Sequence, residues 1–181
     1  MKQTFIDSVK DGAIQGYRDY GILPSLTIAQ AILESGWGKS ELTTKSNNMF
    51  GVKADDSWNG NKVLSPTKEF VKGKWISVQA WFRKYETLDD SMLDHAKFLT
   101  KQRYHKVINQ TDYKIACEEI WKAGYATDPN YPSKLINIIE QNQLYKYDKI
   151  DNSPTIDLDN EFITRNELVS ILKLIINKLE N

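Results

Sequence analysis

The stretch "TIAQAILESGWGKSEL", residues 27–42, places one acidic residue at the end of an apolar helix. Apolar residues recur there at the spacing of one helical face, and Glu34 follows them directly. The helix is expected to begin at Pro24 or Ser25 and to end at Gly36. A carboxylate among apolar side chains needs either a partner or a chemical role. The stretch therefore predicts either a paired structural glutamate or a carboxylic acid kept protonated for catalysis.

The composition is that of an ordinary globular protein, with 40% apolar and 27% charged residues in a chain of 181. Basic and acidic residues number 24 each, so no bulk attraction to nucleic acid follows. The single cysteine, Cys117, excludes an intramolecular disulfide and lies in a helical pattern that predicts a buried, inert thiol. No signal peptide or membrane-spanning run is evident. We therefore expect synthesis in the cytoplasm, so that action outside the cell would require release through a membrane lesion.

Helical periodicity covers most of the chain. It predicts further helices at residues 4–20, 87–99, 112–123 and 131–147. Between residues 46 and 85 the pattern alternates, and Lys72-Gly73 separates two apolar runs, which predicts a β-hairpin. Pro66 suggests that the first strand is bent or lies at an edge. The expected fold is α+β, mainly α, with a small β-hairpin lobe beside a helical lobe and a cleft between them.

The end of the chain is expected to form a separate element. After a main domain of residues 1–147, residues 148–163 are polar and rich in turn formers, which predicts a linker. Residues 164–181 combine a capping-box pattern with a broad apolar stripe, as in an amphipathic helix. Such a helix needs a covering partner. That partner is the main domain, a second copy of the chain in a homo-oligomer, or a further domain.

Four motifs then follow one another in order: "AILESGWGKS", "NNMFGVK", "PTKEF" and "GYATDPNYPSKL", with "FRKYETLDDSMLDHAKFL" between the last two. Together they resemble the glucosaminidase family of peptidoglycan hydrolases, of the flagellar-rod, autolysin and phage-endolysin type. The resemblance covers residues 3–147. It implies a lysozyme-like fold and hydrolysis, without a cofactor, of the β-1,4 bond between N-acetylglucosamine and N-acetylmuramic acid in cell-wall glycan strands.

The resemblance also assigns catalytic residues. Glu34 matches the family's general acid, and burial at an apolar helix end would raise its pKa and keep the proton available. Glu69 matches a second glutamate that would activate water, although an ordinary strand glutamate is the alternative; Asp55 and Asp56 are further candidates for this role. Tyr125 matches a tyrosine near the scissile bond. A phenol there could orient the N-acetyl group for substrate-assisted hydrolysis, which would leave Glu69 without that role.

A second set of residues is expected to bind the sugar. Phe50 and Tyr131 have motif support, and Trp58 lies in a loop that precedes the predicted hairpin. The Asn48 amide could hold an acetamido group or cap a turn. Trp37, beside Glu34 in the sequence, fits the core as well as the cleft.

Metal binding is not predicted. His95 and His105 lack a ligand spacing, and His95 fits a structural role near Asp94. Two other functions remain open on the sequence alone. One is muramidase or lytic transglycosylase action on the other glycosidic bond. The other is an inactive glycan-binding module of a phage particle or flagellar assembly.

Overall fold

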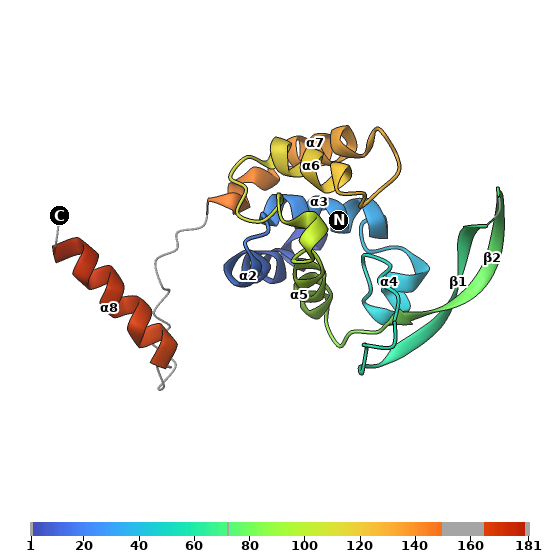
Figure 1. Ribbon diagram of the computed structural model, residues 1–181, viewed down its shortest axis with the longest axis horizontal. Coiled ribbons are helices and arrows are strands. Elements are labelled where there is room, and N and C mark those ends of the chain that lie inside the picture. Colours follow the sequence, from blue (N-terminus) through green and yellow to red (C-terminus); the bar gives the residue numbers. More distant parts are fainter. Residues whose placement is uncertain (1, 72, 150–164, 180–181) are drawn as a thin grey trace. The chain divides into compact units, whose positions relative to one another are not determined.

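The protein divides into two units, residues 1–149 and residues 150–181, and each is described by itself. The computed structural model describes residues 2–71, 73–149 and 165–179. The first unit is a set of helices around one core with a two-stranded antiparallel sheet attached to it (Figure 1). This arrangement confirms the predicted α+β fold, mainly α.

The N-terminal helix is interrupted. Instead of one helix at residues 4–20, the chain forms α1 (Lys2–Asp7) and α2 (Lys10–Tyr20). The break lies at Val9, whose φ of −128° and ψ of −11° are not helical. Val9 is fully buried there, so the change of direction brings its side chain into the core. A periodic apolar pattern cannot reveal such a break, because both halves keep the same spacing.

Helix α3 (Pro24–Ser35) runs through the core and is buried from Pro24 to Ile32. It ends at Gly36, whose φ of 58° gives the left-handed conformation that closes a helix, as predicted. The hydroxyl of Ser35 accepts a hydrogen bond of 2.7 Å from the Gly38 amide, which fixes the following turn. The last turn of α3 therefore has a defined direction, and that turn carries Glu34.

The predicted hairpin is present as β1 (Lys62–Val71) and β2 (Lys74–Arg83), paired in register from Lys62 opposite Arg83 to Val71 opposite Lys74. Gly73 takes the positive φ, 79°, that the tight connection requires. With two strands, both are edges, so Pro66 is tolerated. Phe82, only 6% exposed, holds the base of the hairpin and pairs with Lys53.

Further helices complete the first unit. They are α4 (Glu41–Ser46), α5 (Leu88–Phe98), α6 (Tyr113–Lys122), α7 (Tyr131–Gln141) and the 3-10 helices η1 (Gln102–Tyr104) and η2 (Leu144–Asp148). The helices predicted at 87–99 and 112–123 are confirmed as α5 and α6. The helix predicted at 131–147 is wrong in its last part, because Gln143 takes a φ of 52° and the chain turns into η2.

Helix α5 lies very close to α2. A Cβ atom on Gly12 would approach the Cα of Asp89 to 2.9 Å, and one on Gly16 would approach the Cβ of Ala96 to 2.9 Å. These two glycines therefore permit backbone contact between the helices. The contact fixes the position of α5, which contributes to one wall of the site described below.

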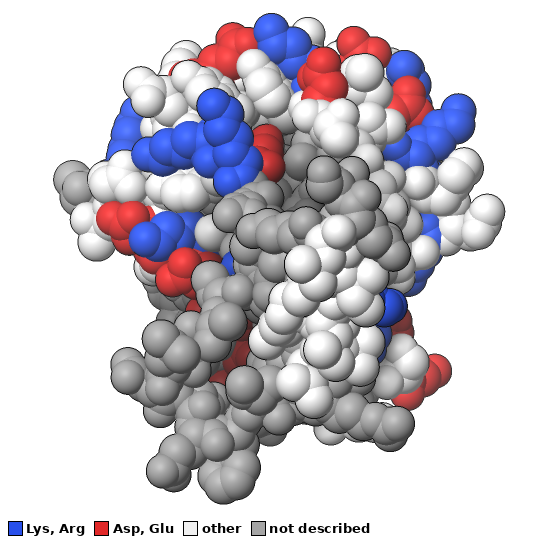
Figure 2. All heavy atoms as spheres, turned by 90° about the vertical axis from the view of Figure 1, so that its left-hand side faces the viewer, with Lys and Arg blue, Asp and Glu red and all other residues white. Residues whose placement is uncertain are grey.

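The second unit contains α8 (Arg165–Leu179), which corresponds to the predicted terminal helix. Several of its apolar side chains are exposed: Leu168, Val169, Leu172, Ile175, Ile176 and Leu179. Most of the predicted linker, residues 150–163, lies outside the described residues. On the face drawn in Figure 2, basic and acidic side chains are intermingled, as the balanced composition suggests. No helix in the described part of the chain is both long and apolar enough to cross a membrane.

Candidate active site

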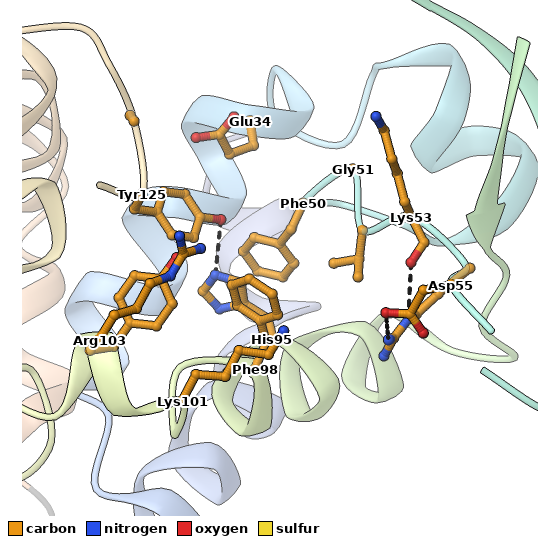
Figure 3. Close-up of a pocket in the computed structure, with 14 residues that line it drawn as sticks. Glu34, Phe50, Gly51, Lys53, Asp55, His95, Phe98, Lys101, Arg103 and Tyr125 are labelled. Carbon is orange, nitrogen blue, oxygen red and sulfur yellow. Dashed lines mark hydrogen bonds and ion pairs between the residues drawn. The ribbon is translucent and has the colours of Figure 1, made fainter. Parts of the chain in front are cut away.

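A cleft of about 400 Å³ in the first unit brings together residues from several elements (Figure 3). Its walls come from the end of α3, the loop before β1, the end of β2, α5, η1 and the loop after α6. The lining residues are Glu34, Phe50, Gly51, Val52, Lys53, Asp55, Arg83, His95, Phe98, Lys101, Arg103, Tyr104, Tyr125 and Ala126. Of the seven predicted site residues, Glu34, Phe50 and Tyr125 line this cleft.

Glu34 is the one exposed side chain of α3. Its carboxyl opens onto the cleft, yet the protein packed around it displaces enough water to raise its pKa. The Tyr131 hydroxyl donates a hydrogen bond of 2.7 Å to Glu34 Oε1 and offsets part of that rise. Trp37, the neighbour in the sequence, instead packs edge-on against Phe5 at 6.0 Å. Glu34 is thus a carboxylic acid with access to solvent and a proton held more tightly than usual.

Tyr131 is predicted from its motif to bind the sugar, but it is not among the residues that line the cleft. It is 4% exposed at the start of α7, and its oxygen accepts a hydrogen bond of 3.2 Å from Gln30 Nε2 of α3. Burial raises the pKa of Tyr131, so the phenol keeps its proton. Its contact is therefore with the carboxyl of Glu34, where it acts as a fixed donor.

Replacing Tyr131 with Phe tests this contact. The hydrogen bond stabilises ionised Glu34, so its loss raises the pKa of that carboxyl further. An acid that must be protonated loses activity as the pH rises through its pKa. The alkaline limb of the kcat/KM profile is therefore expected to move to higher pH in Tyr131→Phe. The exposed Tyr145, changed to Phe, is the matched control and should leave the limb in place; an unmoved limb in both variants would contradict the coupling.

Tyr125 is held by a histidine that the sequence placed in a structural role. His95 is 1% exposed on α5, and its Nε2 lies 3.1 Å from the Tyr125 hydroxyl, as the dashed line in Figure 3 shows. Burial lowers the pKa of His95 to about 3, so the ring is neutral. The ring of Phe50 stacks on it with centroids 3.8 Å apart. Phe50 thus touches the cleft and also fixes the imidazole behind it.

The hydrogen-bonding pattern assigns the tautomer of His95. Its buried Nδ1 has no hydrogen-bond partner among the described residues. An orphaned N–H is rarer and costlier than an unfilled lone pair, so the proton is assigned to Nε2. Nε2–H then donates to the Tyr125 oxygen. The phenol's own proton is left for another acceptor, and burial keeps it there by raising the pKa of Tyr125 well above its ordinary value. Tyr125 is therefore a hydrogen-bond donor at the cleft wall.

Arg83 joins the hairpin to α5. Its Nη1 lies 2.9 Å from both carboxylate oxygens of Asp94, and the Tyr85 hydroxyl donates to the same carboxylate at 2.6 Å. The guanidinium also lies 4.6 Å from the ring centre of Trp58 and 3.8 Å from Asp55 Oδ2. This network forms one end of the cleft, and no local sequence pattern indicates it.

Trp58 lies outside the cleft that holds Glu34. It lines a neighbouring cavity of about 420 Å³, together with Tyr85 and residues at the start of α5. Its indole Nε1 donates to the Asn61 carbonyl at 2.9 Å. Contact with a sugar at the same time as Glu34 is thus not supported for Trp58; its ring supports Arg83.

Asn48 caps a turn, which was the alternative prediction for it. It is 1% exposed, and its Nδ2 donates to the carbonyls of Val52 and Arg83 at 2.9 and 2.8 Å. Its Oδ1 accepts from the Val52 amide at 3.0 Å. Both amide protons are engaged, so Asn48 shapes the loop that carries Phe50 and has no donor left for an acetamido group.

The candidates for the second catalytic carboxylate are Glu69, Asp55 and Asp56. Glu69 pairs with Ile76 near the far end of the hairpin, and its side chain lies outside the described part of the molecule. Asp55 lines the cleft, whereas Asp56 is not among the lining residues. The pKa of Asp55 is lowered by its hydrogen bond with Ser57 and by nearby cations. Among the described side chains, Glu34 and Asp55 thus line one cleft with pKa values shifted in opposite directions, a pattern typical of acid–base pairs.

Other chemistry is not indicated by the described residues. No group of three or more His, Cys, Asp or Glu side chains among them is placed to hold a metal ion. Cys117 is buried in the core as predicted, and burial raises the pKa of its thiol to about 12, which makes it unreactive.

Comparison with known proteins identifies the family. A glucosaminidase family model, described as mannosyl-glycoprotein endo-beta-N-acetylglucosaminidase, matches residues 10–144. Exo-glucosaminidase LytG of Bacillus subtilis is 44% identical over 165 residues, which are 87% of this chain and 58% of LytG. Peptidoglycan hydrolase FlgJ of Vibrio parahaemolyticus is 38% identical over 75% of this chain and 46% of FlgJ. This chain thus spans about half the length of these relatives.

The fold agrees with the sequence match. The catalytic domain of the autolysin Auto from Listeria monocytogenes superposes with a TM-score of 0.74 at 38% identity, over 81% of this chain and 86% of that domain. A glycoside hydrolase domain of FlgJ from Salmonella typhimurium superposes with a TM-score of 0.67 at 34% identity, over 79% of this chain and 98% of that one. The chain therefore carries a lysozyme-like enzyme domain and belongs to the glucosaminidase family.

Proposed function

We propose that this protein hydrolyses the β-1,4 bond between N-acetylglucosamine and N-acetylmuramic acid in peptidoglycan, with Glu34 as the general acid. The observation that carries the proposal is the state of Glu34. It is exposed to the cleft, and its pKa is raised by burial. Such an acid can protonate the leaving glycosidic oxygen near neutral pH.

Tyr125 acts in the same step as a donor to the substrate. Because His95 donates to its oxygen, the phenol proton is available to the carbonyl of an N-acetyl group beside the scissile bond. In a substrate-assisted route that acetamido group attacks the anomeric carbon. In an inverting route Glu69 activates water, with Asp55 as the described alternative inside the cleft. The anomer formed at first turnover, read by NMR, separates retention from inversion.

The names of two relatives point to cleavage of different glycosidic bonds. The Bacillus subtilis relative is named an exo-glucosaminidase, whereas a relative from Lactococcus lactis, 34% identical over 84% of this chain and 36% of its own length, is named a probable N-acetylmuramidase. Mass spectrometry of digested peptidoglycan decides between these bonds. We expect reducing-end N-acetylglucosamine; reducing-end or anhydro-muramic acid would refute the proposed bond. Long products at early times indicate endo cleavage, and single disaccharides indicate exo cleavage.

The role of His95 as a positioning residue predicts a split between two variants. His95→Phe keeps a ring to stack on Phe50 but removes the donor to Tyr125, and we expect kcat to fall about tenfold with KM little changed. His95→Gln places an amide N–H near the position of Nε2 and should restore most of the rate. In a Tyr125→Phe background the two His95 variants should behave alike, because the group they orient is gone. Equal loss in both variants with Tyr125 present would argue for packing alone.

The cellular setting and the oligomeric state also belong to the proposal. We propose that the enzyme acts in cell-wall lysis, as a phage endolysin or an autolysin. Lysis of cells by added enzyme, with no lysis on expression inside cells unless the membrane is breached, would support this.

The exposed apolar residues of α8, among them Leu172 and Ile176, favour self-association through residues 164–181. Light scattering of the intact chain is expected to give more than the monomer mass of 20.9 kDa, and Leu172→Glu with Ile176→Glu is expected to restore it. A monomer for the unchanged chain would contradict the assembly.

A further inference from the structure

The cleft is more basic than the chain as a whole. Four of its lining residues are Lys or Arg and two are acidic, in a protein with 24 of each. Arg83 is compensated by Asp94 at 2.9 Å, and Asp55 lies 3.8 Å from the same guanidinium. The other basic residues that line the cleft are Lys53 of the loop, Lys101 just before η1 and Arg103 within η1.

Lys101 and Arg103 are held in place by aromatic rings and not by close ion pairs. The ammonium of Lys101 lies 4.2 Å from the ring centre of Phe98, and the Arg103 guanidinium lies 4.4 Å from that of Tyr104. No carboxylate of the described residues is within ion-pair distance of either cation. Contact with an aromatic face orders a cation while leaving its charge available to an anion. Lys101 and Arg103 are therefore pre-organised to bind a negative group.

A third donor lies at the same place. Tyr104 is fully buried, and its hydroxyl proton finds no acceptor among the described residues. Arg103, packed on the same ring, has donors only and cannot accept that proton. An ammonium, a guanidinium and a buried hydroxyl thus occur together, and none of them is paired with a carboxylate of the described residues. We call Lys101, Arg103 and Tyr104 the cationic edge.

The cationic edge lies beside the reacting groups. The rings of Tyr104 and Tyr125 have centroids 6.2 Å apart, and Figure 3 shows Lys101 and Arg103 across the cleft from Glu34. A ligand for this edge is therefore part of the sugar being cut or of its immediate neighbour. In peptidoglycan, one sugar of each pair carries acidic groups: a lactyl carboxyl, either free or joined to a peptide that bears carboxylates of its own.

We propose that the cationic edge binds a carboxylate of the muramyl branch next to the scissile bond and so selects peptidoglycan over neutral glycans. The inference rests on the proposed hydrolysis and adds the group that is recognised. A planar guanidinium binds a carboxylate through two parallel hydrogen bonds, and the ammonium adds a second charge-assisted contact. The aromatic rings beneath them exclude water from one side of each contact.

The test compares Lys101→Gln/Arg103→Gln with the wild type on matched substrates. They are teichoic-acid-free glycan with intact peptides, the same glycan stripped of peptides so that the lactyl carboxylate is free, and each of these with its carboxylates converted to neutral amides. On the intact charged glycan we expect kcat/KM of the double variant to fall about tenfold, mainly through KM, as for the loss of charge-assisted contacts. On amidated glycan the two proteins should be equal. Lys97→Gln/Lys106→Gln, exposed cations that do not line the cleft, is the control and should match the wild type throughout.

The outcomes separate the sources of the anion. Because the lactyl carboxyl is amide-bonded in intact glycan, a defect confined to intact glycan identifies a peptide carboxylate as the ligand. A defect that persists on stripped glycan shows that the free lactyl carboxylate is bound as well. A defect of the same size on amidated glycan, or no defect beyond that of the control, would overturn the inference.

Binding keeps this test independent of turnover. Co-sedimentation with intact glycan is measured in a Glu34→Gln background, with and without the cationic-edge substitutions. Edge-dependent, salt-sensitive binding in this background, together with no cleavage by the wild-type protein, would sustain the inference and refute the proposed hydrolysis. Cleavage without any dependence on carboxylates would do the reverse.

Discussion

Glu34→Gln is expected to lower the rate of glycan hydrolysis by about a hundredfold or more, the scale of general acid catalysis. Glutamine keeps the shape of the side chain and can accept the Tyr131 hydrogen bond, but it has no proton to give to a leaving oxygen. Turbidity loss of purified cell walls, followed for both proteins in parallel, measures the effect. Glu41→Gln, which alters an exposed glutamate on α4, is the matched control and should retain full activity.

The stability of Glu34→Gln should not fall with its activity. Below the ordinary glutamate pKa the Glu34 carboxyl is protonated in both the folded and the unfolded chain, so it makes no difference between them. Because the folded-state pKa is raised, the unfolded chain ionises first as the pH increases, and folding loses stability in that window. Removing the group is therefore expected to leave the neutral-pH stability equal or higher in urea unfolding.

In the turbidity assay, equal activity of Glu34→Gln and wild type would mean that the carboxyl is structural. Inactivity of both would favour a glycan-binding module.

The largest expected effect on stability comes from Asp94→Asn. Asp94 and Arg83 are only 18% and 14% exposed at their side chains. The substitution leaves the largely buried guanidinium with the exposed Asp55, 3.8 Å away, in place of its close buried partner. Breaking a pair of this kind costs about 3 kcal/mol. For a chain of 181 residues, a loss of that size lowers Tm by about 6–12 °C, which calorimetry or thermal circular dichroism measures.

Two further variants identify the cause. Glu41→Gln breaks the exposed Lys45–Glu41 pair and should leave the free energy of unfolding almost unchanged. The double variant Arg83→Met/Asp94→Leu removes both charges and should recover most of the loss. If Asp94→Asn were as mild as Glu41→Gln, the pair would have no structural importance. If the double variant were as unstable as the single one, the loss would come from packing.

The sequence predicted the helical core, the hairpin and Glu34 because each has a local signal. Helix α3 shows one apolar period closed by Gly36, and the hairpin shows alternation around Gly73. Contacts between residues that are distant in the sequence have no such signal. Tyr131 matched a motif, but its hydroxyl reaches a carboxyl 97 positions away, and no periodicity encodes such a contact.

His95 shows the same limit. It belongs to the buried stripe of α5, like Met92, and that pattern is identical for a core residue and for one that holds a cleft side chain. No local pattern marks Arg83 and Asp94 as partners, because their pairing requires the hairpin and α5 to be folded together. Glu69 stays a prediction, since the hairpin is present but the side chain lies outside the described residues.

The long reach between Glu34 and Tyr131 also has a consequence for the timing of synthesis. During translation, α3 emerges early, but the hydroxyl that holds its carboxyl follows 97 residues later. At the usual pace of a ribosome that delay is about 5–20 s. Throughout it, the growing polypeptide has the acid without the helix that positions it. The contact between Glu34 and Tyr131 therefore forms only near the end of production of the unit of residues 1–149.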